Sequence, residues 1–154
     1  MSEQQGIGSN VVTQVGIIVK DIEKTLDHYV RVFQLKERPN VIITDTVDKA
    51  RTELRGESTL ARAKLSFINM GQITIELIEP DGQPSTWQEH LDSHGESVHH
   101  IAFQIKGTEQ VVAYLNGQGI ATVQQGQYTG GMYSYMDSMP QLGVMLELLE
   151  NFGK

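Results

Sequence analysis

Four segments of the chain alternate residue types in the manner of β-strands, and they form two matching pairs. Residues 14–20 match residues 100–106, and residues 73–79 match residues 144–150, with the same chemical type at almost every position. An internal repeat of this kind predicts two similar modules. We place module one at about residues 11–80, a connector at 81–96 and module two at about 97–150, within a single domain of residues 1–154.

A helical pattern follows the first strand in each half. Residues 21–34 have apolar side chains at helical spacing behind a suitable N-cap, Asp21, and residues 108–116 repeat the pattern with Gly117 near the end. A third, shorter helix is expected at residues 85–91, where Ser85 precedes Gln88 by three positions. Each module is therefore predicted to run strand, helix and then several strands, which is an α+β fold.

Side chains along a strand point alternately to opposite faces. One face of the four strands is wholly apolar, as expected where helices pack. The other face carries one metal-binding side chain per strand, at positions equivalent under the repeat: Gln14, Glu76, His100 and Glu147. Taken singly, such residues are usually solvated or structural. Two carboxylates on an otherwise apolar face need a compensating charge, however, so we predict that the four bind one divalent metal ion.

Composition limits the possible metal ligands and partners further. The 154 residues include no cysteine, so a metal must be held by oxygen and imidazole ligands. The net charge of −7 argues against nucleic acid as a partner. No stretch reaches the roughly 18 to 20 apolar residues of a membrane span, and the polar start does not look like a signal peptide, which favours the cytoplasm. The basic stretch 49–64 is either a solvated hairpin or a contact for an anionic substrate tail.

The remaining candidates are weaker. His99 falls on the opposite face from His100 by simple alternation, and we expect it to be structural, like the surface or structural histidines His28, His90 and His94. Tyr133 and Tyr135 follow a glycine turn and could contact a substrate. Trp87 is expected to be a packing anchor.

Four motifs carry a resemblance to a known family. QVGIIVKD (14–21), IELIEP (75–80), VHHIAF (98–103) and GVMLEL (143–148) are similar to motifs of the vicinal oxygen chelate superfamily, which includes glyoxalase I, methylmalonyl-CoA epimerase, extradiol dioxygenases and the bleomycin resistance proteins. The resemblance implies two βαβββ modules in a curved sheet around a metal-binding cavity. It also implies a homodimer and one divalent ion (Co, Ni, Zn, Mn or Mg), with Gln14, Glu76, His100 and Glu147 as its ligands.

The same resemblance implies a reaction. Such enzymes abstract a proton beside a carbonyl and stabilise a metal-bound enediolate, with Glu147 as the preferred base and Glu76 as the second candidate. The motif context favours a methylmalonyl-CoA epimerase-like enzyme acting on a small molecule such as an acyl-CoA. Gln14 instead fits lactoylglutathione lyase (glyoxalase I), although Ile18 and Glu96 stand where that enzyme binds glutathione with arginines. A metal-free binding or resistance protein is the third alternative.

Overall fold

The structure is a computed structural model of the chain and describes residues 6–153. Its strands form one mixed sheet in the order β2-β5-β6-β1-β7-β10-β9-β8-β3-β4. The strands are β1 (Gln14–Ile18), β2 (Ile42–Ile43), β3 (Glu53–Leu54), β4 (Glu57–Ser58), β5 (Ala63–Asn69), β6 (Thr74–Pro80), β7 (Ser97–Gln104), β8 (Ala121–Tyr128), β9 (Gly131–Asp137) and β10 (Met145–Asn151). The helices are α1 (Ile22–Phe33), α2 (Val47–Ala50), α3 (Thr86–His94), α4 (Thr108–Gly117) and α5 (Met139–Leu142).

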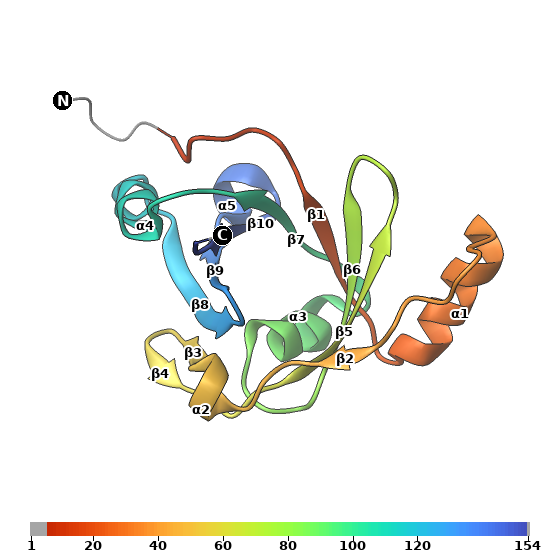
Figure 1. Cartoon of the computed structure of the whole chain (residues 1–154). Helices are drawn as coiled ribbons and strands as arrows, with labels where there is room; N and C mark the ends of the chain where they lie inside the picture. Colours follow the sequence, from red (N-terminus) through yellow and green to blue (C-terminus); the bar gives the residue numbers. More distant parts are fainter. Residues whose placement is uncertain (1–5, 154) are drawn as a thin grey trace.

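The two predicted modules are present as β1-α1-β2-β5-β6 and β7-α4-β8-β9-β10, so the βαβββ prediction is confirmed. Strand β1 pairs in parallel with β6, and β7 pairs in parallel with β10. The modules join where β1 pairs antiparallel with β7. The sheet curls around a central space, with α1 and α4 on its outside (Figure 1).

The predicted helices are confirmed with small shifts at their ends. Asp21 caps α1 by accepting a hydrogen bond from the Lys24 amide at 3.1 Å, and Ser85 caps α3 by accepting one from the Gln88 amide at 3.0 Å. Helix α3 continues to His94, three residues beyond the predicted end. These local caps fix where α1 and α3 start.

The core lies on both sides of the sheet. The outer apolar face packs under the helices, in one cluster beneath α1 and another beneath α4, as the alternation predicted. A third cluster lies within the curl and includes Ile18, Ile78, Trp87 and Tyr135. This inner cluster packs beside the polar side chains that face the central space.

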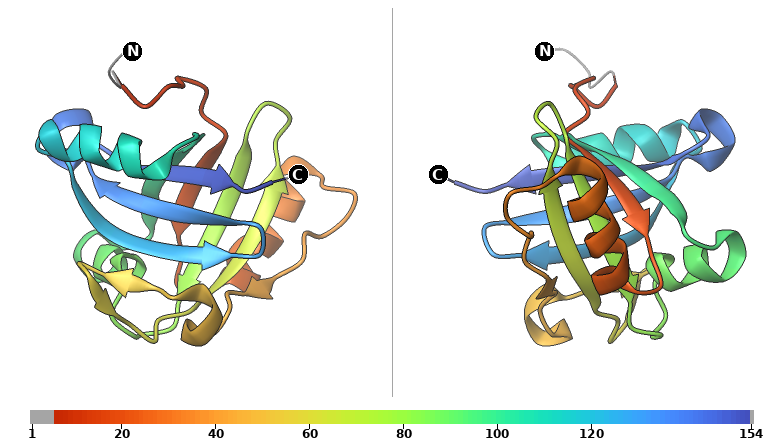
Figure 2. Two further views of the ribbon diagram at one scale, coloured as in Figure 1. Left: turned by 60° about the vertical axis from the view of Figure 1, so that its left-hand side comes forward. Right: turned by 90° about the vertical axis from the view of Figure 1, so that its right-hand side faces the viewer.

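Within residues 49–64, strands β3 and β4 form a hairpin that crosses from one module to the other. Strand β3 pairs with β8 of module two, at Glu53 with Gln125, although it lies between two strands of module one in the sequence (Figure 2). Arg55, at the turn of the hairpin, makes two 2.8 Å hydrogen bonds to Glu89 of α3. Among the helices of residues 6–153, none is long and apolar enough to cross a membrane.

Candidate metal centre

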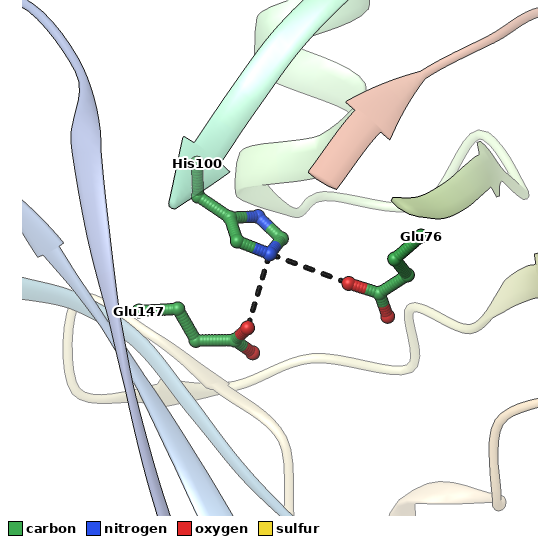
Figure 3. A group of neighbouring side chains, drawn as sticks. All are labelled: Glu76, His100 and Glu147. Carbon is green, nitrogen blue, oxygen red and sulfur yellow. Dashed lines mark ion pairs between the residues drawn. The ribbon is translucent and has the colours of Figure 1, made fainter. Parts of the chain in front are cut away.

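Three of the four predicted ligands meet inside the curl of the sheet (Figure 3). Glu76 comes from β6, His100 from β7 and Glu147 from β10, so both modules contribute; we call these residues the ligand trio. His100 Nε2 lies 3.3 Å from Glu76 Oε1 and 3.0 Å from Glu147 Oε1. The three residues are only 6 %, 0 % and 4 % exposed, respectively. One chain is sufficient to assemble this group.

The ligand trio has the chemistry that a divalent cation needs. Within residues 6–153, Glu76 Oε1, His100 Nε2 and Glu147 Oε1 are buried and lack an aligned hydrogen-bond partner, despite their short separations. A buried polar atom left unpaired costs about 1–3 kcal/mol. One imidazole nitrogen and two carboxylate oxygens within 4.8 Å of one another form a donor set that suits zinc and similar ions. The residues therefore fit a divalent metal ion.

In the metal-free protein, the residues of the ligand trio shift one another's pKa values. Burial disfavours the charged form of His100, but the carboxylates of Glu147 and Glu76 outweigh burial and raise the pKa of His100 to about 10. Burial also raises the pKa of Glu147, an effect that His100 opposes. At neutral pH, His100 therefore carries a proton that an incoming cation must displace.

Gly16 makes room for the His100 ring. It lies on β1 between its partners Glu76 on β6 and His100 on β7. A Cβ atom built on Gly16 would lie 2.1 Å from His100 Cε1, so any larger residue would displace the imidazole. The alternation placed Gly16 on this face, but it gave no sign that the ring lies against the backbone there.

Gln14, the fourth predicted ligand, lies in the neighbouring row of the sheet. Its strand partner on β7 is Ala102, which in turn pairs with Glu147 on β10. Gln14 is half-buried and lines the same cavity as Glu76 and Glu147. Its position is compatible with a fourth ligand, and that role stays a prediction.

A β-bulge brings His99 to His100. Gly16 pairs with His100 whereas the next residue, Ile17, pairs with Val98, so His99 is an extra residue in β7. Both histidines are buried and their Nδ1 atoms lie 2.8 Å apart. Simple alternation placed the two side chains on opposite faces, and the bulge is the reason that they nevertheless touch.

This contact orients the metal-binding nitrogen of His100. If Nε2 gives its lone pair to a cation, His100 keeps its proton on Nδ1 and donates it to His99 Nδ1. His99 Nε2 then donates to Thr86 Oγ1, 3.2 Å away on α3. Hydrogen bonds of this kind fix the tautomer and direction of a ligating imidazole. The sequence gave no signal for Thr86, which lies 13 residues from His99 and approaches it only in the fold.

The trio opens into a cavity of about 550 Å³, within the usual range for small-molecule sites. Trp87, Tyr133 and Tyr135 line one side. Trp87 Nε1 donates to the Tyr135 hydroxyl at 3.0 Å, and Gln124 donates to the Tyr133 hydroxyl at 3.0 Å. Burial raises the pKa of both tyrosines, which therefore stay neutral. Trp87 is 3 % exposed, as expected of a packing anchor, and it also faces the cavity.

The other three histidines lie outside the trio. His90 stacks on His94 with ring centroids 4.8 Å apart, and its Nε2 lies 2.8 Å from Ser97 Oγ. His28 contacts Arg31 on the exposed side of α1. These contacts agree with the expected structural and surface roles.

Comparison with known proteins assigns the chain to a family. The sequence profile of the Glyoxalase/Bleomycin resistance protein/Dioxygenase superfamily matches residues 13–135. The chain belongs to this superfamily. The vicinal oxygen chelate assignment made from the four motifs is thereby confirmed. Among curated proteins, none matches this chain significantly.

Solved structures share the fold at low identity. Methylmalonyl-CoA epimerase from Mycobacterium tuberculosis has a TM-score of 0.66 at 17 % identity, covering 99 % of this chain and 94 % of that one. A Streptomyces coelicolor methylmalonyl-CoA epimerase variant in complex with 2-nitronate-propionyl-CoA has a TM-score of 0.62 at 19 % identity, with 92 % and 97 % covered. A hypothetical protein from Bacillus halodurans C-125 has a TM-score of 0.64 at 21 % identity, covering 93 % of this chain and 95 % of that one. At these identities the likeness establishes the fold alone.

Proposed function

We propose that this protein is a metal-dependent isomerase that removes a proton from a carbon beside a carbonyl group. The observation that carries the proposal is the buried trio of Glu76, His100 and Glu147 at the wall of a cavity large enough for a small molecule. Gln14 would complete the ligand set. A divalent ion bound there would act as a Lewis acid toward the substrate oxygens.

The carboxylates of the trio supply the proton chemistry. Glu147 is the preferred base, because burial raises its pKa toward the range in which a carboxylate accepts a proton efficiently. Glu76 lies on the other side of His100, on a different strand, and is the second candidate (Figure 3). Removal of the proton by one carboxylate and return by the other would invert the carbon, which is epimerisation.

Two substrate types fit this chemistry. The fold neighbours named as methylmalonyl-CoA epimerases support an acyl-CoA, which is our first choice. A lactoylglutathione lyase-like reaction is the alternative, supported by Gln14 at the first ligand position. Against that alternative, Ile18 is fully buried and Glu96 accepts a hydrogen bond from the Lys20 amide, so neither offers a cation to glutathione.

Exchange of the α-proton with heavy water, followed by NMR, tests the proposal. Metal-reconstituted protein is incubated separately with methylmalonyl-CoA, 2-methylbutanoyl-CoA and the hemithioacetal of methylglyoxal and glutathione. We expect exchange on an acyl-CoA, reduced by about 100-fold or more in Glu147→Gln. Exchange confined to the hemithioacetal would select the lyase instead.

The third alternative, a metal-free binding or resistance protein, makes a different prediction. It requires that the protein hold no ion tightly and that Glu147→Gln be harmless to ligand binding. Absence of exchange on all three substrates, in protein shown to hold its ion, would refute the isomerase. Stoichiometric metal in the purified protein would exclude the metal-free alternative. The expected homodimer is a separate proposal, which the molar mass in solution tests.

A further inference from the structure

The charges that line the cavity are negative. Within residues 6–153, the acidic and basic side chains on its wall are Asp45, Glu76 and Glu147, and no lysine or arginine joins them. Asp45 is exposed and lies just after β2. An anionic group entering this space would meet carboxylates and no fixed cation.

The ligand trio with a bound divalent ion would carry no net positive charge. With a divalent ion bound, the carboxylates of Glu76 and Glu147 cancel its two charges, and His100 is neutral. A substrate carboxylate brought here would be desolvated and would give the neutral site a net negative charge, which is costly.

Three of the five basic side chains in residues 49–64 are held by other partners. Arg55 is bound to Glu89 through two 2.8 Å hydrogen bonds, and Lys64 lies 3.7 Å from Glu79. Arg62 donates from Nε to the Thr44 carbonyl at 2.8 Å. This part of the chain therefore offers the cavity no uncommitted cation from these three residues.

Much of the remaining cavity wall is apolar. It is formed by Ile42 and Ile43 of β2, Leu65 and Phe67 of β5, and Leu149 of β10. Ile42, Ile43 and Phe67 are 49 %, 56 % and 41 % exposed, so apolar surface is available for a ligand to cover. A bound apolar group would gain roughly 25 cal/mol for each Å² of such surface removed from water.

We infer that this cavity takes the uncharged, largely apolar acyl part of a carbonyl compound and discriminates against the same acyl part bearing a free carboxylate at the reacting carbon. The inference rests on the proposed function for the place of the reacting carbon, and it narrows that function. The acyl group would lack the second carboxylate that a malonyl group carries. Asp45 acts in this discrimination as a negative charge at the cavity wall.

Binding of matched esters and acids tests the inference. The pairs are methyl mandelate with mandelate, and methyl 2-hydroxyoctanoate with 2-hydroxyoctanoate. Both members of a pair have two adjacent oxygens and an α-proton, and they differ chiefly in charge. Trp87 is the only tryptophan of the chain and lines the cavity, so its fluorescence reports binding without turnover. At pH 7 we expect the esters to bind at least about tenfold more tightly, in metal-loaded and metal-free protein alike.

A charge reversal at Asp45 sharpens the test. Asp45→Lys should tighten binding of the acids by severalfold and leave the esters unchanged. Glu109→Lys makes the same change of net charge on the exposed start of α4, away from the cavity wall, and should alter neither. Acids that bind as tightly as their esters, or failure of both pairs to bind, would overturn the inference.

The outcome is separable from that of the proposed function. Preference for the esters without α-proton exchange on any substrate would refute the isomerase and leave the charge preference standing. Exchange on methylmalonyl-CoA as fast as on 2-methylbutanoyl-CoA, together with equal binding of acid and ester, would confirm the isomerase and overturn the charge preference.

Discussion

The internal repeat relates two rows of cavity-facing residues that together form the site. One row runs Glu76, Gly16, His100 across β6, β1 and β7, and the other runs Glu147, Ala102, Gln14 across β10, β7 and β1. Each row has a glutamate at one end, a small residue in the middle and a nitrogen-bearing side chain at the other end. The rows differ in how firmly that last side chain is held.

In the first row the His100 ring lies against Gly16, is fully buried and is contacted from its other edge by His99. In the second row Gln14 is only half-buried. The repeated backbone supplies equivalent donor positions, while the residues around each donor decide how rigidly it is placed. We therefore expect the first row to dominate metal affinity.

Deleting the end residue of each row should have the largest effect. His100→Ala should weaken metal binding by about 100-fold or more, because the nitrogen donor of the ligand trio is lost. Gln14→Ala should weaken metal binding by about tenfold or less, since only a neutral and partly hydrated amide is lost. Metal content after dialysis and competition with a chelator measure both, with circular dichroism to verify the fold. Wild-type metal content in His100→Ala would contradict the site assignment.

Exchanging the middle residues should have the next largest effect. Gly16→Ala places a Cβ within 2.1 Å of the His100 ring and should reduce metal affinity by about 10- to 100-fold, as misorientation of a ligand typically does. The matched change in the other row, Ala102→Gly, should leave affinity unchanged and cost about 0.5–1 kcal/mol of stability. Equal losses of affinity in the two variants would show that the rows do not differ.

The proton on His100 predicts a pH dependence. Because its pKa is about 10 in the metal-free protein, a cation must displace this proton, and apparent affinity should rise about tenfold per pH unit between pH 6.5 and 8. Calorimetry in buffers of different ionisation enthalpy should detect the released proton. In the metal-free protein, the raised pKa of His100 also contributes to the stability of the folded state. This contribution is fully present below about pH 6.5, the pKa of histidine in the unfolded chain, and is lost as the pH rises through about 10. An affinity independent of pH would contradict the protonated state of His100.

The smallest effect should come from the aromatic wall beside the second row. Tyr135→Phe removes the acceptor of the buried Trp87 N–H and should lower the free energy of unfolding, measured in urea, by about 1–2 kcal/mol. Tyr128→Phe removes an exposed hydroxyl that donates to Asn151 at 2.7 Å, and should cost less than about 0.5 kcal/mol. If the two variants lost the same free energy of unfolding, burial of the hydrogen bond between Trp87 and Tyr135 would add nothing to stability.

Much of the fold was predictable because its signals are local. Alternation marked the four strands that carry the site, caps such as Asp21 and Ser85 marked where helices begin, and the repeat indicated two modules. The crossing hairpin was not predictable in this way. Its two-residue strands leave almost no periodic pattern, and pairing with β8 joins residues about seventy positions apart, as Glu53 with Gln125 shows.

The sequence by itself determined which residues could be ligands, because alternation assigns each side chain to a face of its strand and the repeat marks equivalent positions. It selected Glu76, His100 and Glu147, which the fold then brought together. Only the tertiary structure decided how they meet. The register of β1 on β7 puts Gly16 beneath His100, and the bulge turns His99 toward it. Register and bulges depend on packing between strands far apart in the chain, which local periodicity does not record.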